Sequence, residues 1–192
     1  MERKFILTDK FVINSFGIKL FQIKCTKSFK YAQKGDFGGY VEKEGNLDQE
    51  NDAWVFGNAR VFGNARVSGD AWVSGDAWVS GDAWVSGDAW VSGDAWVFGN
   101  AWVSGNAWVS GNADIENDNE HCGFDGFGSC NRHTHAYMTK EKKVEIICGC
   151  FRGSIEEFEK KVEETHSGTV YEKQYKSIIN VIKIKFGLTD FT

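Results

Sequence analysis

The sequence predicts a mainly β protein whose middle third is a parallel β-solenoid of hexapeptide repeats. The unit Ala-Trp-Val-Ser-Gly-Asp, with Phe and Asn variants, recurs from Ala53 to Asn112 and contains all eight tryptophans. A unit of six residues buries no core alone, so its copies must coil and stack on each other. The chain has 22 glycines and no proline, which leaves glycine to make the turns.

The direction of each side chain follows from strand geometry. In a short strand, Ala and Val point to one face, while Trp and Ser point to the other. A glycine followed by Asp or Asn tolerates positive φ and predicts a corner. Ala and Val are small enough for a narrow interior, so we expect every tryptophan to point outward.

The segment Val73-Ser74-Gly75-Asp76-Ala77-Trp78 resembles the repeat of the left-handed β-helix hexapeptide proteins. The resemblance covers residues 47–118, because the period starts in degenerate form at Leu47, six residues before Ala53. It implies a left-handed parallel β-helix in which three hexapeptides form one triangular coil of about 18 residues.

A coil of this length places equivalent side chains in columns, with a spacing of about 4.8 Å. The columns hold the candidate binding residues, and each arginine lies one rung from a tryptophan, on which its guanidinium can stack. The first column contains Trp54, Trp72, Trp90 and Trp108; the second Arg60, Trp78 and Trp96, followed by Asp114; the third Arg66, Trp84 and Trp102. The columns have two possible roles. They either rigidify the outer surface of the solenoid, or they form a surface that binds a partner protein or, through the first column, a second copy of the chain.

Smaller elements are expected on both sides of the solenoid, which gives predicted domains of 1–45, 46–118 and 119–192. The first is a β cap with strands at 4–7 and 18–23, a turn at 14–17, and a loop at Gly35, Gly38 and Gly39. The last is a ββαα domain with a hairpin of residues 133–139 and 144–151. Ser154 with Glu157 and Thr169 with Glu172 then form capping boxes for two helices.

The two flanks carry a second resemblance. The segments Gly35-Asp36-Phe37-Gly38-Gly39-Tyr40-Val41-Glu42 and Cys148-Gly149-Cys150-Phe151-Arg152-Gly153-Ser154 are similar to those of uncharacterised hexapeptide-repeat proteins of bacteriophages and prophages. The resemblance implies a phage origin and a setting in the host-cell cytoplasm. It implies no activity and no site residues.

The net charge of −5 is unevenly distributed along the chain. Residues 1–45 carry +4, residues 46–114 carry −7 and residues 115–192 carry −2. A nucleic-acid-binding surface needs a row of basic residues that contact the phosphates, so direct nucleic-acid binding by the acidic solenoid is not expected. No apolar run approaches the roughly 18 residues of a membrane span, and the first ten residues lack the apolar core of a secretory signal. These features favour a cytoplasmic protein with reduced thiols.

A group of Cys and His side chains is the one candidate for a metal site. Cys122, Cys130, His133, His135, Cys148 and Cys150 lie close together in the sequence. The Cys-x-Cys and His-x-His spacings differ from the usual zinc-binding Cys-x₂-Cys, so packed or free thiols are favoured over zinc. We therefore expect no metal and no cofactor.

The sequence favours a non-catalytic, phage-derived interaction protein that binds and inhibits or sequesters a host protein, such as a component of a defence system. The alternative is an enzyme, because many left-handed β-helix proteins resemble acyltransferases that work as trimers with a histidine base between subunits. No histidine lies in the repeat and no loop interrupts it, so no catalytic residue is assigned.

Overall fold

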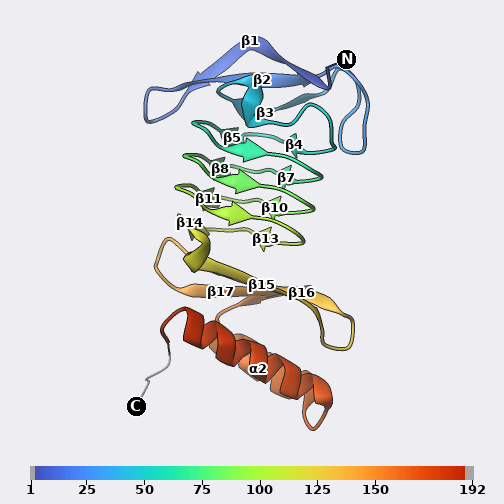
Figure 1. The fold of residues 1–192 in the computed structure, drawn as a ribbon, viewed down its shortest axis with the longest axis vertical. Helices are drawn as coiled ribbons and strands as arrows, with labels where there is room; N and C mark the ends of the chain where they lie inside the picture. Colours follow the sequence, from blue (N-terminus) through green and yellow to red (C-terminus); the bar gives the residue numbers. More distant parts are fainter. Residues whose placement is uncertain (1–2, 189–192) are drawn as a thin grey trace. The chain divides into compact units, whose positions relative to one another are not determined.

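The computed structural model describes residues 3–188, and the chain separates into two compact units, residues 1–117 and 118–192. The first unit contains a parallel β-solenoid of about four turns, which confirms the predicted fold (Figure 1).

The solenoid consists of two-residue strands, one in each hexapeptide. They are β4 (Trp54–Val55), β5 (Arg60–Val61), β6 (Arg66–Val67), β7 (Trp72–Val73), β8 (Trp78–Val79), β9 (Trp84–Val85), β10 (Trp90–Val91), β11 (Trp96–Val97), β12 (Trp102–Val103), β13 (Trp108–Val109) and β14 (Asp114–Ile115). Each pairs in parallel with the strand one coil away, as Trp72 pairs with Trp90. This register confirms the 18-residue coil.

The strands form three walls. The first wall is β4-β7-β10-β13, the second contains β5-β8-β11-β14, and the third is β6-β9-β12 (Figure 1). Alanine and valine fill the interior as predicted, since Ala71 and Val73 are fully buried and their equivalents in the other coils are nearly so. Backbone hydrogen bonds join the coils, as from Trp72 N to Ala89 O at 2.9 Å.

Glycine is required at the corners for two separate reasons. Gly75 has φ +71°, in the left-handed region that L side chains rarely adopt. A Cβ added there would also lie 2.9 Å from the backbone nitrogen of Gly93 in the next coil. The coils therefore approach too closely at this corner for any side chain.

The N-terminal segment continues the second wall. Strands β1 (Phe5–Ile13) and β2 (Lys19–Cys25) form the predicted antiparallel hairpin, and β3 (Phe37–Val41) then pairs in parallel with β5. The predicted loop at Gly38 and Gly39 is wrong, because both residues lie in β3. A Cβ at Gly38 would lie 2.6 Å from the Ile23 side chain and the Val55 carbonyl oxygen, so this glycine serves close packing.

A short 3₁₀ helix, η1 (Glu44–Asn46), leads from β3 into the third wall. Leu47 then bridges to Val67 in parallel and is buried. Leu47 thus takes a valine position in the coil, whereas its sequence spacing from Ala53 predicts the alanine position. The difference arises in the loop after Leu47, which departs from the six-residue period.

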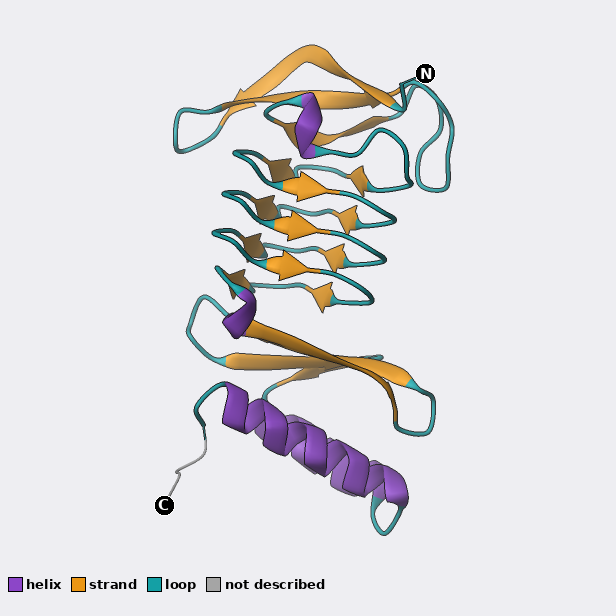
Figure 2. Cartoon of the chain, in the orientation of Figure 1, coloured by secondary structure: helices purple, strands orange, loops and turns teal. Residues whose placement is uncertain are grey.

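The second unit begins with a 3₁₀ helix, η2 (Asp118–Glu120), and contains one antiparallel sheet with two helices on one face (Figure 2). The sheet order is β15 (His121–Phe127), β16 (Arg132–Met138), β17 (Val144–Cys148), β18 (Phe151–Gly153). The predicted hairpin corresponds to β16 and β17. The edge strands β15 and β18 were not predicted by the sequence analysis.

The helices are α1 (Ile155–His166) and α2 (Val170–Lys185). The capping box at Ser154 is complete, whereas at the second helix Thr169 accepts from Glu172 N but the Glu172 carboxylate accepts from Gly168 N. Apolar helix residues pack on the sheet in one core, which contains Ala136, Ile146, Cys148, Ile155, Phe158, Val162, Tyr175, Ile178, Ile179 and Ile182.

Candidate functional site

Tryptophans of successive coils stack on each other along the outside of the solenoid. The ring centroids of Trp84 and Trp102 are 5.4 Å apart with an interplanar angle of 8°, and those of Trp78 and Trp96 are 5.2 Å apart at 8°. On the first wall, Trp72 and Trp90 stack at 5.5 Å. These offset stacks contribute about 0.5–1.5 kcal/mol per pair beyond burial and hold the indoles in one orientation.

On the third wall, a hydrogen bond from the Nε1–H group also fixes the edge of each indole. Trp84 Nε1 donates to Ser68 Oγ at 2.9 Å, and Trp102 Nε1 donates to Ser86 Oγ at 3.4 Å. The acceptor in each case belongs to the preceding coil. The sequence analysis missed these serines, although an 18-residue coil with Ser two residues after Trp would have indicated the contact.

Trp54 is not part of the exposed surface that the sequence predicted. Its side chain points away from the interior, but it is only 1% exposed because the N-terminal segment covers it. Phe29 and Phe5 contact the indole edge-on, at centroid distances of 5.3 and 6.2 Å. The expectation of an unbroken exposed column on the first wall is therefore wrong, since a segment distant in sequence packs over its first rung.

The same segment reaches two further tryptophans. Tyr31 lies edge-on to Trp72 at 5.1 Å, and Phe16, in the turn between β1 and β2, lies edge-on to Trp78 at 6.1 Å. Both indoles are half-buried as a result. The more exposed tryptophans are those of later coils and of the third wall: Trp84, Trp90, Trp96, Trp102 and Trp108.

The two arginines of the repeat differ in their contacts. The Arg60 guanidinium lies over the Trp78 ring at 5.1 Å, so the predicted cation–π contact is confirmed there. Arg66 is exposed and pairs in register with Trp84 across β6 and β9. Arg66 and Trp84 line the same pocket, and no cation–π contact joins them in the described part of the chain.

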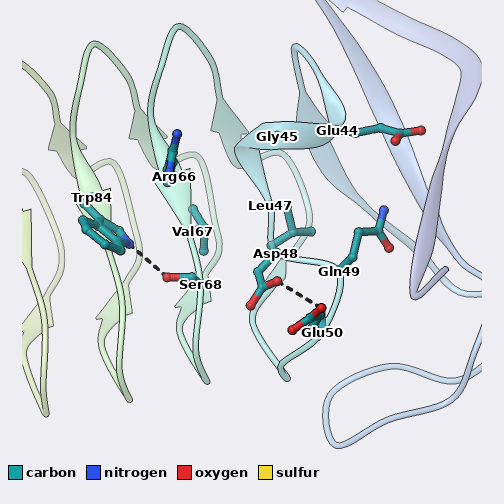
Figure 3. Close-up of a pocket in the computed structure, with 10 residues that line it drawn as sticks. All are labelled: Glu44, Gly45, Leu47, Asp48, Gln49, Glu50, Arg66, Val67, Ser68 and Trp84. Atoms are coloured by element: carbon teal, nitrogen blue, oxygen red, sulfur yellow. Dashed lines mark hydrogen bonds between the residues drawn. The ribbon is translucent and has the colours of Figure 1, made fainter. Parts of the chain in front are cut away.

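This pocket on the third wall has a volume of about 560 Å³ and contains both charged and aromatic groups (Figure 3). Arg66 and Ser68 come from β6 and its corner, Trp84 from the next coil, and the acidic side chains from the segment before the first coil. Its lining is Glu44, Gly45, Leu47, Asp48, Gln49, Glu50, Arg66, Val67, Ser68 and Trp84. The pocket thus joins two predicted site residues to a loop that the sequence analysis did not single out.

Hydrogen bonds favour the charged form of Asp48, on the acidic side of the pocket. Burial alone would raise the pKa of Asp48, but the Glu50 N–H and the Asn51 side-chain amide donate to its carboxylate and lower the pKa overall. Glu44 forms an ion pair with Arg3 at 2.6 Å. Because Arg3 already pairs with Glu44, two carboxylates, Asp48 and Glu50, stand against the single guanidinium of Arg66, and the pocket favours a cationic group.

A second, more apolar pocket of about 380 Å³ lies on the second wall, lined by Phe16, Trp78, Ser80, Trp96, Phe98 and Asp114. Most of its lining is aromatic, and Phe16 from the cap forms one side. It demonstrates that the cap shapes the surface of the second wall as well as covering it.

The Asp and Asn columns at the corners are part of the coil scaffold. Asp76 N donates to Gly93 O at 2.9 Å, and the Asn64 side-chain amide donates to Asp82 Oδ1 at 3.1 Å. Within residues 3–188, no group of three or more His, Cys, Asp or Glu side chains is arranged to hold a metal ion.

In the sheet of the second unit, Cys122 and Cys148 lie on one face, whereas His133 and His135 lie on the other. Cys148 faces the helices, where it accepts from Thr134 Oγ1 at 3.3 Å. Cys122 packs against the same core, and burial raises the pKa of its thiol to about 11. His133 and His135 alternate with Thr134 along β16 and point to the other face. The six residues therefore do not form one zinc cage.

The histidine face contains one fully buried imidazole. Burial lowers the pKa of His135 well below its usual value, and the neighbouring His121 and His133 lower it further. His133 Nδ1 lies 2.8 Å from Asp125 Oδ1, and the His121 and His135 rings stack at 5.3 Å. His135 is consequently neutral over the physiological pH range.

Comparison with known families agrees with the six-residue period of the solenoid. Residues 53–69, 59–75 and 65–81 each match the family described as the YdcK beta solenoid repeat. This is a β-solenoid repeat protein. The matched stretches of the solenoid include both arginine-bearing strands, β5 and β6, and the pocket residues Arg66, Val67 and Ser68. No curated protein matches the chain.

Neither helix of the described chain combines the length and the apolar character that crossing a bilayer requires.

Proposed function

We propose that this β-solenoid is a non-catalytic interaction protein that binds a protein partner through its third wall. The observation that carries the proposal is the exposure of Trp84 at 42% and of Trp102 at 51%, beside an interior already filled by alanine and valine. Exposed, contiguous apolar surface of this kind marks interaction sites, and tryptophan is prominent among the residues that dominate interface energies.

The third wall is favoured over the other two because its indoles are both open and fixed. The N-terminal segment contacts the first wall at Trp54 and the second at Trp78. The third-wall indoles stack in parallel, and each donates its N–H to a serine. Such side chains lose little conformational entropy when a partner covers them, which favours binding.

Charge indicates the chemistry of the partner. Residues 46–114 carry −7, and the third-wall pocket contains the carboxylates of Asp48 and Glu50. A partner surface rich in arginine and lysine would pair with these carboxylates and stack on Trp84. The proposed partner is therefore a protein with a basic, partly apolar face.

The finer proposal is that the chain derives from a phage and that the partner is a host protein, such as a defence component, which binding inhibits or sequesters in the host cytoplasm. Its support is the similarity of the two flanking segments to phage and prophage hexapeptide-repeat proteins. The lack of a histidine in the repeat gives no support to the acyltransferase alternative.

The test uses two matched double variants. Trp84→Ser with Trp102→Ser removes the third-wall pair, and Trp90→Ser with Trp108→Ser removes an equally placed, exposed pair from the first wall. A protein captured from host lysate is identified, purified and titrated against each variant. We expect the third-wall variant to weaken binding by about 2–4 kcal/mol and the first-wall variant to bind normally.

The salt dependence of binding and the thermal stability of the variants complete the test. Because the partner is expected to be basic, the affinity should fall as salt concentration rises. Equal binding by both variants and the unaltered protein would mean that the third wall is not the binding surface. Partial loss in both variants, with a matching loss of thermal stability, would assign the tryptophans a structural role.

A further inference from the structure

The pocket on the second wall lies where the repeat departs twice from its usual residues. Phenylalanine replaces the serine of the unit at Phe98, and aspartate replaces the tryptophan at Asp114. Both side chains line this pocket of about 380 Å³, together with Phe16, Trp78, Ser80 and Trp96. The volume falls within the range of about 300–1,000 Å³ that is typical of small-molecule sites.

Packing on the N-terminal segment accounts for the other two phenylalanines of the repeat. The Phe56 ring centroid lies 6.5 Å from that of Tyr31, and the Phe62 centroid lies 6.2 Å from that of Phe16. Phe98 belongs to a coil two turns further along the solenoid and borders the pocket. The packing of the first coil onto the N-terminal segment therefore gives no reason for Phe98, whereas a ligand in the pocket would.

The second wall already holds one cation on an indole. Arg60, Trp78, Trp96 and Asp114 pair in register along successive coils. The Arg60 guanidinium lies 5.1 Å from the centre of the Trp78 ring, which stacks on Trp96 at 5.2 Å. At the other end of this column, Asp114 is much shorter than the indole that it replaces, and the pocket extends to the rung beside Trp96. A second cation placed there would lie next to both an indole and a carboxylate.

The lining favours a cation without N–H groups. Four of its six side chains are aromatic and differ in orientation, since Phe16 lies edge-on to Trp78 at 70° whereas Trp96 is nearly parallel to it. Aromatic faces attract cations, and groups of aromatic rings recognise quaternary ammonium ligands. A primary ammonium would bring three donors to a lining in which only Ser80 and Asp114 offer side-chain acceptors, and unmade hydrogen bonds are costly.

The charge around the pocket has the sign that a cation needs. Asp114 is half-buried, and a carboxylate there attracts a cation more strongly than one at an open surface. The corners on the two sides of the second wall add the exposed Asp76, Asp82 and Asp94. Arg60 is the one basic residue of β5, β8, β11 and β14, and it does not line the pocket.

We propose that the second-wall pocket binds the quaternary ammonium group of a small organic cation, with choline as the probe. Trp96, Phe98 and Asp114 hold the trimethylammonium head, and the apolar surface of Trp78 and Phe16 contacts the rest of the ligand. The site shares no lining residue with the pocket on the third wall, so it is independent of the proposed partner binding.

The test is a calorimetric titration of the full-length protein with choline chloride at constant ionic strength. We expect one molecule to bind per chain in the submillimolar range. The uncharged isostere, in which a tert-butyl group replaces trimethylammonium, has the same shape. It should bind at least about 10-fold more weakly, because it lacks the attraction to the aromatic rings and to the carboxylate. Tetramethylammonium should compete with choline, whereas the same concentration of sodium should not.

Two variants restore the usual residues of the repeat and are therefore expected to retain the fold. Phe98→Ser removes one ring, and Asp114→Trp extends the indole stack into the site; each should weaken choline binding by at least about 10-fold. Asp114→Asn changes only the charge and should weaken binding by about 3–10-fold. The matched control is Trp84→Ser with Trp102→Ser on the third wall, which should bind choline normally. Circular dichroism checks the fold of each variant.

Three results would overturn the proposal: no choline binding by the unaltered protein, equal binding of the isostere, or unchanged binding by Phe98→Ser and Asp114→Asn. Loss of choline binding in the third-wall variant would also overturn it, by placing the cation near Trp84. Because choline lipids carry the same head group, co-sedimentation with phosphatidylcholine vesicles distinguishes the two sources. We expect the protein to stay in the supernatant, and vesicle binding that Phe98→Ser abolishes would assign the ligand to a lipid instead.

Discussion

The indole nitrogen of Trp84 donates to the hydroxyl of Ser68 at 2.9 Å, and this bond joins the outer surfaces of two successive coils. The indole remains 42% exposed while its edge is fixed. An exposed aromatic side chain is ordinarily mobile, whereas this one is held by a hydrogen bond and by the stacked ring of Trp102. The third wall is therefore a rigid aromatic surface.

Replacing different tryptophans of the repeat should have unequal effects on stability, although their local sequences are similar. Trp54→Ser should lower the free energy of unfolding by about 3–5 kcal/mol, because the indole is buried against Phe5 and Phe29. Trp84→Ser should cost about 1 kcal/mol, since it loses one stack and one exposed hydrogen bond. Urea unfolding measures both. Equal losses would contradict the covering of Trp54 by the N-terminal segment.

Two glycines with similar backbone angles provide a test of the close approach between coils. Gly17 has φ +77° and nothing within 4 Å of an added Cβ, so Gly17→Ala should cost only the strain of the left-handed region, about 1–2 kcal/mol. Gly75→Ala adds a clash with Gly93 and should cost about 1–3 kcal/mol more. Thermal unfolding of the two variants gives the difference directly, and equal costs would mean that the coils can move apart freely.

Lys4 should make stability depend on alkaline pH. Burial lowers the pKa of its amine to about 8, and Nζ donates to Ala53 O at 2.9 Å. Between about pH 8 and the usual lysine value near 10.4, the unfolded chain binds this proton and the folded chain does not. The free energy of unfolding contributed by Lys4 should therefore rise with pH across this window.

Lys4→Met isolates that contribution from the other groups that titrate at alkaline pH. The difference in unfolding free energy between the unaltered protein and the variant should change between pH 8 and pH 10, in favour of the unaltered protein at the higher pH. A difference that stays constant over this range would show that the folded amine keeps an ordinary pKa.

Self-association through the first wall is tested by light scattering. With Trp54 buried and Trp72 contacted by Tyr31, the predicted dimer surface retains Trp90 and Trp108 as its exposed indoles. Two partly exposed indoles supply far less than the roughly 800 Å² per subunit of a stable interface. We expect a monomer whose mass is unchanged by Trp72→Ser with Trp90→Ser. A dimer that this double variant dissociates would restore the homodimer hypothesis.

The sequence by itself determined the coil. A strict six-residue period leaves few alternatives: Ala71 and Val73 must fill the interior, Gly75 must turn the corner, and Trp72 must stack on Trp90. Each of these follows from contacts between neighbouring repeats, which the local pattern encodes. The capping box at Ser154 is predictable for the same reason, because its partners lie within one helical turn.

Only the tertiary structure decided which parts of that regular surface stay open. Trp54 and Trp84 have nearly identical neighbours in sequence, yet Phe29 covers the first and the second lines a pocket. Likewise, Gly123 and His133 come together through the pairing of β15 with β16. Burial and side-chain contacts depend on segments distant in the chain. A repeat with nearly the same sequence in every copy does not indicate which of its copies another segment will cover.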